Sequence, residues 1–409
     1  MQKLLKRRMA VTSAIIAAAL GLPGMAVAAQ KPAKAPAPRY SVKTIGDIVQ
    51  LHDNKTDATV SVLTGTSNAY EFVVHGKNVI SMNIPSTTAL RNNPGLNGVP
   101  FLGPFANRLD EMAFYANGKK YSFDPGLGNV RSPIPQQGFL NGTHDWKLVS
   151  AKADANGATV VNKLDFYRNP DWMKQFPFAQ TYTMTIRLKD GALEVNTRID
   201  NLSTQPLPVS IGYHPYFALP ESDRNHWSLD FGADTHWLET DAHLPTGEKE
   251  TADAFFGGDH HNVPLSRFTD KRFDEVFSDL DRDAQGRASV VIKGDTTSIK
   301  VTAGPKIKTF LLYSEILPPP GTPAPAGRGG AAPGAPRPAP VTFPYDGPVV
   351  PLTAPNDMPR NTRGFIAIEP MAGITNSMNM AQKGQYNELQ YIAPGSSWNE
   401  SIWITPSGY

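Results

Sequence analysis

The chain has 409 residues, 40% of them hydrophobic and none of them cysteine, which excludes disulfide staples and thiolate catalysis and requires a large core for stability. Four of its 39 basic side chains lie in the first 28 residues, so the remainder carries 35 basic against 37 acidic residues. This near-neutral balance offers no electrostatic footprint for nucleic acid or an anionic membrane surface, and we expect neither as a partner.

The N-terminus has the pattern of an export signal. Basic residues between positions 3 and 8 precede an apolar run from Met9 to about Leu22, and Ala26-Val27-Ala28 fits the A-x-A pattern of a cleavage site. We therefore predict a signal peptide over 1–28 and a periplasmic or secreted mature protein. The Arg7-Arg8 pair leaves both the general secretory and the twin-arginine route open. Residues 29–39 are rich in Pro and Ala and predict an extended linker.

From position 40 onward, apolar and polar residues alternate with the period of two that is typical of β-strands. This pattern predicts strands at Thr59–Leu63, Tyr70–Val74, Tyr182–Leu188, Leu193–Ile199, Ser289–Lys293, Ser298–Thr302, Thr309–Tyr313, Phe365–Ile368 and Ser401–Thr405. Asn117-Gly118 and Asp190-Gly191 predict two tight hairpins, because both dipeptides tolerate the positive φ angles of primed turns.

The class is all-β, since no stretch sustains a helical period, and this many strands favour a large sandwich over a closed barrel. We predict a single domain over 40–409. Residues 317–359 interrupt it, because Pro, Gly and Ala dominate there and cannot bury enough apolar surface to order a chain. We interpret them as a disordered insertion between two strands.

The most informative segment runs from Asn196 to Leu219, where one strand ends in a polar turn and a second strand brings Gly212 to Phe217, which read GYHPYF. Its histidine, His214, lies between aromatic residues and before a proline, which holds it stiffly. Taken alone, such a histidine is more often a hydrogen-bonded core residue than a catalytic one.

Together with four other stretches in the same order, however, this segment resembles the aldose 1-epimerase (galactose mutarotase-like) family. The stretches are G-P-F-A-N-R at 103–108 with a following G-K-K-Y-S-F hairpin, F-D-E-V-F at 273–277, I-E-P-M at 368–371, and L-Q-Y-I-A-P-G-S-S-W at 389–398. The resemblance spans roughly residues 40–405 outside the insertion.

The resemblance implies a galactose mutarotase-like β-sandwich (supersandwich) and an enzyme that interconverts the α and β anomers of a free aldose. It implies His214 as the acid and Glu369 as the base, two groups that can exchange protons near neutral pH. Arg108, Asn107 and Asp274 would bind the monosaccharide. We expect no cofactor and no metal.

Gln137 departs from the family pattern, because many members carry a second active-site histidine at this place. Glutamine can still donate a hydrogen bond to a sugar oxygen but cannot carry a proton. We therefore keep Gln137 as a substrate-binding residue, with His144 as a histidine that could fold back into the site instead. A non-catalytic sugar-binding protein stays an alternative, as does a glycoside hydrolase or polysaccharide lyase on the same kind of fold.

Two other groups of residues attract attention. Asp259-His260-His261 could be part of a metal site, but it has no matched second cluster in sequence, and we interpret it as a solvated turn. Trp172, Phe176 and Phe178 could stack on a sugar, and we expect them in the core instead.

Overall fold

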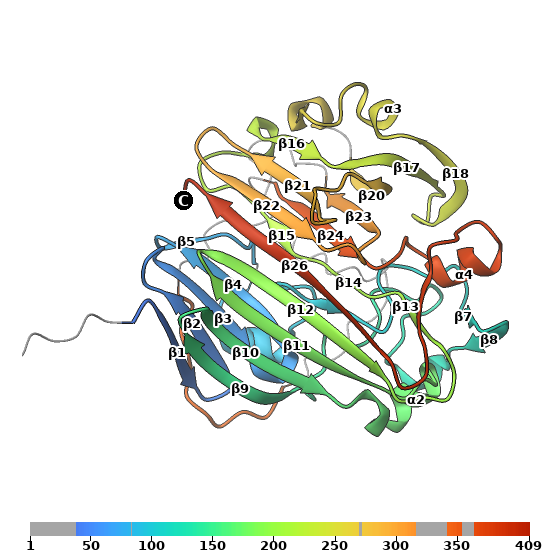
Figure 1. Cartoon of the computed structure of the whole chain (residues 1–409), viewed down its shortest axis with the longest axis horizontal. Helices are drawn as coiled ribbons and strands as arrows, with labels where there is room; N and C mark the ends of the chain where they lie inside the picture. The colour runs from blue at the N-terminus through green and yellow to red at the C-terminus, as the bar shows by residue number, and fades with distance from the viewer. Residues whose placement is uncertain (1–37, 83, 270–271, 316–341, 354–363) are drawn as a thin grey trace, which may run out of the picture. The chain divides into compact units, whose positions relative to one another are not determined.

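Antiparallel strands make up nearly all of the regular structure (Figure 1). The structure, a computed structural model, describes residues 38–409 except 83, 270–271, 316–341 and 354–363. The predicted signal peptide and nearly all of the predicted linker lie outside the described residues. Within the described part of the chain, no helix has the length and apolar character needed to cross a membrane.

Five consecutive strands form the first sheet, in the order β1 (Tyr40–Ile45), β2 (Ile48–Asp53), β3 (Ala58–Leu63), β4 (Asn68–Val74) and β5 (Lys77–Asn78). A second sheet of nine strands has the order β19 (Val263–Pro264), β16 (Ser228–Phe231), β21 (Ala288–Lys293), β22 (Ser298–Ala303), β26 (Ser397–Ser407), β12 (Ala192–Asn201), β11 (Gln180–Lys189), β10 (Gly157–Leu164) and β9 (Lys147–Asp154). The first sheet contacts the second through β1 and β2 against β9, β10 and β11.

The third sheet has eight strands. Seven of them follow the order β18 (Pro245–Thr251), β17 (Ala233–Glu239), β20 (Phe273–Leu280), β23 (Thr309–Ser314), β24 (Ile366–Met371), β14 (Gly212–Tyr213) and β6 (Phe101–Leu102), while β15 (Tyr216–Phe217) also pairs with β24. Two small sheets pair β13 (Leu207–Val209) with β25 (Gln390–Ile392) and β7 (Ala113–Ala116) with β8 (Lys119–Ser122). The described helices are short: α1 (Thr87–Asn92), α2 (Pro170–Gln175), α3 (Ala252–Phe256) and α4 (Ser377–Gln382).

All nine predicted strands are confirmed, and both predicted hairpins form. Asn117 and Gly118 join β7 to β8 with φ angles of 52° and 72°, and Asp190 and Gly191 join β11 to β12 with 50° and 72°. Positive φ at both central residues is the mark of a type I′ turn, whose twist matches that of the strands it joins.

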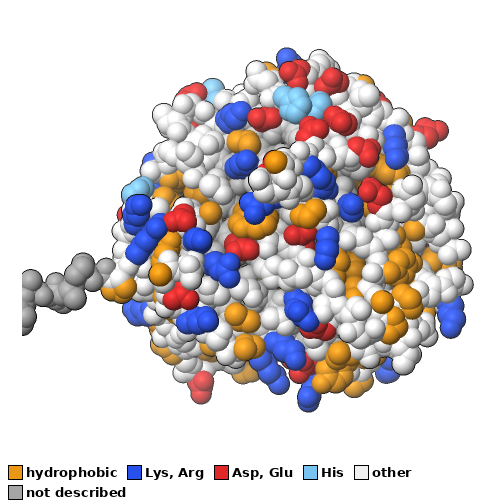
Figure 2. All heavy atoms as spheres, in the orientation of Figure 1, with side chains coloured by type: hydrophobic (Ala, Val, Ile, Leu, Met, Phe, Trp, Pro, Cys, Tyr) orange, Lys and Arg blue, Asp and Glu red, His pale blue; other side chains and the backbone are white. Residues whose placement is uncertain are grey.

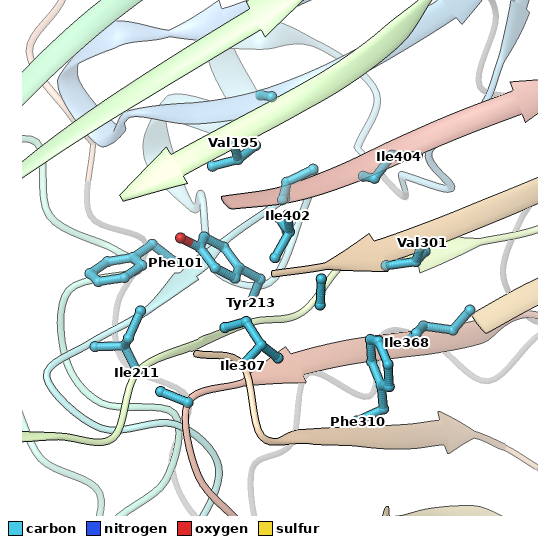
Figure 3. Close-up of a cluster of buried hydrophobic side chains, with 14 of the residues drawn as sticks. Phe101, Val195, Ile211, Tyr213, Val301, Ile307, Phe310, Ile368, Ile402 and Ile404 are labelled. Atoms are coloured by element: carbon cyan, nitrogen blue, oxygen red, sulfur yellow. The ribbon is translucent and has the colours of Figure 1, made fainter. Parts of the chain in front are cut away.

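The main core lies between the nine-stranded and the eight-stranded sheet. Figure 3 shows Val195, Val301, Ile402 and Ile404 of the former facing Phe310 and Ile368 of the latter. Trp172, Phe176 and Phe178 are also buried in this core, as predicted. On the outside, charged side chains of both signs are interspersed on the face shown in Figure 2, in keeping with the near-neutral composition.

Part of the predicted insertion differs from the prediction of disorder. Residues 342–353 are described, and they pack on the first sheet and α1. Thr353 donates hydrogen bonds from its backbone nitrogen and hydroxyl to the Glu71 carboxylate at 2.7 and 2.9 Å, and the Thr87 hydroxyl donates to the Val350 carbonyl at 2.7 Å. These bonds satisfy polar groups of a Pro-rich segment that has no ladder of its own. The rest of 317–359 lies outside the described residues.

Candidate active site

Glu369 lies on β24 of the eight-stranded sheet, and His214 directly follows the neighbouring strand β14, with both side chains on the same face. Side chains alternate along a strand, so the neighbours of these residues point to the core instead. Ile368 packs in the core of Figure 3, and so does Tyr213, whose hydroxyl lies 2.5 Å from the hydroxyl of Thr197. The same alternation that buries Tyr213 and Ile368 in the core therefore brings the histidine and the glutamate together on the other face.

His214 and Glu369 are in direct contact, with 2.8 Å between Nε2 and Oε1. Both are almost fully buried, at 3% and 1% exposure. The imidazole lies against Tyr216, at 4.6 Å between ring centroids, and meets Tyr313 edge-on at 6.0 Å. Among the described residues, neither Nδ1 of His214 nor Oε2 of Glu369 has a hydrogen-bond partner. One polar atom of each side chain is therefore buried without a partner among the described residues.

Burial and the charge of Asp274 raise the pKa of Glu369, and the contact with His214 opposes this shift without cancelling it. A carboxyl whose pKa lies above its usual range is a stronger base than an exposed one. Such a group suits proton transfer near neutral pH.

Arg108 and Asp274 form a two-pronged ion pair beside Glu369. The guanidinium donates to both carboxylate oxygens, at 3.2 and 2.8 Å, and also to Oδ1 of Asn107 at 3.0 Å. Arg272 adds a bond of 3.2 Å to Asp274. Burial alone would raise the pKa of Asp274, but the adjacent Arg108 outweighs it and holds this pKa below the usual range. Asp274 is therefore ionised and fixed in orientation.

Register places Asp274 on the same face as the His–Glu pair. Asp274 lies opposite Tyr313, and Tyr313 lies opposite Ala367, two residues before Glu369. Because residues two apart share a face of a sheet, all of these side chains line one surface.

Gln137 lies next to Asn107, and the two residues exchange hydrogen bonds. The backbone nitrogen of Gln137 donates to the Asn107 carbonyl at 2.6 Å, and the Asn107 backbone nitrogen donates to Oε1 of Gln137 at 3.1 Å. Both residues have positive φ, 62° and 51°. The structure therefore brings Gln137, Asn107, Arg108 and Asp274 into one connected network, with the carbonyl of the Gln137 amide already used to hold the backbone.

His144 does not fold back into this network. Its Nε2 lies 2.9 Å from the Arg91 carbonyl, and its ring stacks on Phe343 at 3.8 Å between centroids. The idea that His144 replaces the absent histidine is wrong, because α1 and the segment 342–353 hold its ring.

Glu239, at the end of β17, and His243, in the turn after it, also lie beside Asp274, although no sequence motif indicates them. Nδ1 of His243 lies 3.4 Å from Oε2 of Glu239, and its Nε2 lies 3.9 Å from Oδ2 of Asp274. Burial raises the pKa of Glu239 to about 7, and the contact with Glu239 raises the pKa of His243. The two groups can therefore share a proton near neutral pH, beside the Arg108–Asp274 pair.

The Asp259-His260-His261 turn also differs from its prediction. His260 is 8% exposed rather than solvated, and aspartates from distant parts of the sequence surround both imidazoles.

Comparison with known proteins agrees with this architecture. A galactose mutarotase-like protein from Clostridium acetobutylicum matches with a TM-score of 0.68 at 17% identity, over 90% of this chain and 98% of that chain. A galactose 1-epimerase from Lactobacillus acidophilus NCFM gives 0.62 at 12% identity, over 90% and 98%. A stretch of 143 residues, 35% of this chain, is 25% identical to the uncharacterized protein YphB of Escherichia coli (strain K12) and spans only 43% of that relative.

The sheets and their order thus define a galactose mutarotase-like fold. The family model described as aldose 1-epimerase matches residues 53–331, more than half of the chain. The chain belongs to the aldose 1-epimerase family. The matched range contains Arg108, Gln137, His214 and Asp274, whereas Glu369 lies beyond it.

Proposed function

We propose that the protein is an aldose 1-epimerase that interconverts the α and β anomers of a free aldose. The observation that carries this proposal is the buried His214–Glu369 contact, in which each side chain retains one polar atom without a partner among the described residues. Buried polar atoms without a partner are uncommon, because each costs about 1–3 kcal/mol. A sugar that places a hydroxyl and a ring oxygen against this pair would satisfy them.

The pair has the chemistry that ring opening requires. Glu369 accepts the proton of the C1 hydroxyl, and His214, in its protonated form, donates a proton to the ring oxygen. The C1–O5 bond then breaks and C1 becomes an aldehyde. Rotation about C1–C2 and the reverse transfers close the ring on the other face. One proton leaves the sugar and one enters it, so the sugar gains no net charge.

The short distance between the two groups suits this exchange. The C1 hydroxyl oxygen and the ring oxygen are bonded to the same carbon, so the base and the acid must be neighbours. After ring opening, Glu369 is protonated and His214 is neutral. Their 2.8 Å contact keeps the two groups adjacent, and the reverse transfers on ring closure restore the ionised glutamate and the protonated histidine.

Arg108 and Asp274 would orient the sugar through its hydroxyls, with Asn107 and Gln137 fixing the backbone beneath them. The family's second active-site histidine can carry a proton, whereas Gln137 cannot. We further propose that His243, paired with Glu239, takes over this role. Support for this comes from the 3.9 Å separation of His243 from Asp274 and from the raised pKa of both groups.

The test is a time course of anomer ratios by NMR, starting from pure α-anomers of several free aldoses. Glu369→Gln and His214→Asn should each slow the enzyme-dependent exchange at least a hundredfold, because general acid–base groups contribute about 10²–10⁴ each. Glu71→Gln, in an equally buried glutamate on β4, serves as the control and should retain the exchange rate. Thermal unfolding of each variant shows that the fold is retained.

Two other outcomes would replace this proposal. Sugar binding without exchange by the wild-type protein would indicate a non-catalytic binding protein, in keeping with Gln137 in place of histidine. Cleavage of oligosaccharides would indicate a hydrolase that uses Glu239 as a second buried carboxyl group, since hydrolysis needs two. If either active-site variant kept more than about a tenth of the exchange rate, the loss would be too small for a missing proton carrier.

We also propose that the protein acts outside the cytoplasm after cleavage near Ala28. The basic, apolar and A-x-A pattern of residues 1–28 supports this. Intact-mass measurement of exported protein tests it, and an N-terminus upstream of Met9 would contradict it.

A further inference from the structure

A second group of ionisable side chains lies away from the His–Glu pair, where the loop after α3 meets the ends of three strands. His260 and His261 come from the loop, Asp230 from β16, Asp234 from β17, and Asp281 follows the last residue of β20. Figure 2 shows histidine side chains flanked by acidic ones in the part of the molecule where Figure 1 places α3 and β16.

The ring of His260 is held in one orientation by Asp253. Oδ1 of Asp253 lies 2.7 Å from Nδ1 of the imidazole and also accepts the backbone N–H of His260 at 3.0 Å. In the neutral imidazole this contact favours the tautomer with the proton on Nδ1, which leaves a lone pair on Nε2. Histidines that bind metals are commonly fixed in this way, by a carboxylate on the nitrogen that does not bind.

Nε2 of His260 is buried and has no hydrogen-bond partner among the described residues. The nearest acidic atoms are Oδ1 of Asp234 at 3.7 Å and Oδ2 of Asp281 at 4.0 Å. These distances are too long for hydrogen bonds. The lone pair thus points at two carboxylates that cannot donate to it when they are ionised.

His261 repeats the arrangement from the other side. Its Nε2 lies 3.6 Å from the same Oδ2 of Asp281, and its Nδ1 lies 3.4 Å from Oδ1 of Asp230. The two imidazole rings are 4.2 Å apart at their centroids. Nε2 atoms from two histidines therefore converge on one carboxylate oxygen.

This spacing fits a cation between the groups better than it fits direct contact. Ligand atoms about 2.0–2.1 Å from a tetrahedral zinc ion are about 3.4 Å from one another. The ligand atoms of His260, His261 and Asp281 all lie within 4.8 Å of one another, and Asp281 Oδ2 is 4.0 and 3.6 Å from the two Nε2 atoms. These separations are wider than those around a bound ion, so side-chain rotations are needed to close the site. The charge also fits, because four aspartates surround the two imidazoles, Asp230, Asp234, Asp253 and Asp281, and Lys293 pairs with one of them, Asp230, at 3.2 Å.

We propose that His260, His261 and Asp281 bind a divalent transition-metal ion of the zinc class, and that the exposed Asp234 side chain, 3.7 Å from Nε2 of His260, turns in as the fourth ligand. Asp253 and Asp230 orient the two imidazoles and do not touch the metal. Imidazole nitrogen and carboxylate oxygen are the donors that Zn²⁺ accepts in proteins. The side chains of His261 and Asp281 are 52% and 46% exposed, so an ion can reach them from solvent.

The ion would be structural. Its ligands come from a loop, from β17 and from the end of β20, which are brought together only in the folded chain. Metal binding to such a set stabilises the folded state by mass action. The His–Glu pair of the proposed epimerase is not among the ligands, so anomer exchange should not require the ion.

Titration of the chelator-treated, full-length protein with Co²⁺ tests the proposal, because cobalt in a zinc-type site of low coordination number absorbs visible light. We expect about one equivalent to bind, Zn²⁺ to displace it, and Zn²⁺ to raise the unfolding temperature. His261→Ala should weaken binding at least tenfold and abolish the rise. His261 is 52% exposed in its side chain, so this change leaves the core intact.

The matched control is His75→Ala. His75 is 56% exposed and also faces an aspartate, Asp57, at 3.2 Å. That pair consists of one histidine and one carboxylate, whereas the proposed site has two of each. The control should bind Co²⁺ as the wild-type protein does. Asp281→Asn provides an independent variant of nearly equal size, and it should also weaken binding at least tenfold. No stoichiometric binding by the wild-type protein, or binding that neither His261→Ala nor Asp281→Asn weakens, would overturn the proposal.

Discussion

Replacing Glu239 by Gln should make the protein more stable above neutral pH and change how its stability depends on pH. In the folded protein, burial raises the pKa of Glu239 from its ordinary value of 4.5 to about 7. Below pH 4.5 this carboxyl is protonated in both the folded and the unfolded chain. Between about 4.5 and 7 the unfolded chain ionises first, so stability falls as the pH rises, and above about 7 the loss is complete.

The size of this effect follows from the shift. One pKa unit corresponds to about 1.4 kcal/mol, so the wild-type protein loses about 3 kcal/mol at this residue across the interval. Glutamine has nothing to ionise and avoids the loss. For a domain of this length, such a gain corresponds to a rise in unfolding temperature of about 4 °C.

His243 adds to the change at the other end of the range. Its pKa is raised by the contact with Glu239, so it contributes stability below its unfolded value of 6.5, and this contribution disappears as the pH rises through the folded value. In Glu239→Gln the partner is gone. Below about pH 6.5 the variant should therefore lack this contribution, so its advantage is confined to higher pH, and its stability should vary less with pH than that of the wild-type protein.

Thermal unfolding of the two proteins between pH 4.5 and 8.5 measures this difference. Glu248 is an exposed glutamate on the adjacent strand β18. Glu248→Gln therefore removes an exposed charge instead of a buried one and should leave the pH profile of stability unchanged. If Glu239→Gln unfolds at or below the wild-type temperature at pH 8, burial does not disfavour the ionised form of Glu239 and the reasoning is wrong.

Three further substitutions test the geometry of the site. Arg108→Lys should lower kcat/KM for anomer exchange about tenfold, because lysine cannot donate two parallel bonds to Asp274; steady-state kinetics that match the wild type would contradict this. Gln137→Ala should lower the free energy of unfolding in urea by about 1–3 kcal/mol, since the backbone nitrogen of Asn107 loses its acceptor, and an unchanged midpoint would show that the bond is dispensable. Gly138→Ala should cost more than about 3 kcal/mol in the same measurement, because the residue has φ of 61° and a Cβ atom would lie 2.1 Å from a backbone carbonyl oxygen; native-like stability would mean that the loop can move aside.

The sequence predicts the strands and hairpins well because their signals are local. The alternation along Leu193–Ile199 predicts a strand, and the dipeptide Asp190-Gly191 predicts a tight turn, each from only a few residues. The order of the strands within each sheet, by contrast, depends on pairing between segments that are far apart in sequence. β12 lies between β11 and β26, although the last is about two hundred residues away in sequence, and no pattern in either strand specifies that neighbour.

The same distinction applies to the site. His214 and Glu369 stand in recognisable motifs, and the pairing of β14 with β24 explains how they meet. Glu239 has no such motif, and only its burial and the nearby His243 make it conspicuous. The aspartates around His260 were missed for a related reason, since Asp234 and Asp281 approach one another only because β17 pairs with β20.

The segment 342–353 has a consequence for the order of folding. β23 and β24 are paired neighbours, yet residues 315–365 separate them, and closing so long a connection costs about 2 kcal/mol more entropy than closing a hairpin loop of about four residues. The first sheet consists of consecutive strands and can form early from local contacts. Once formed, it presents Glu71 to Thr353 and anchors the connection near its far end. We therefore expect the strand that carries Glu369 to join its sheet late in folding, so that newly made chains acquire a folded first sheet before they acquire activity.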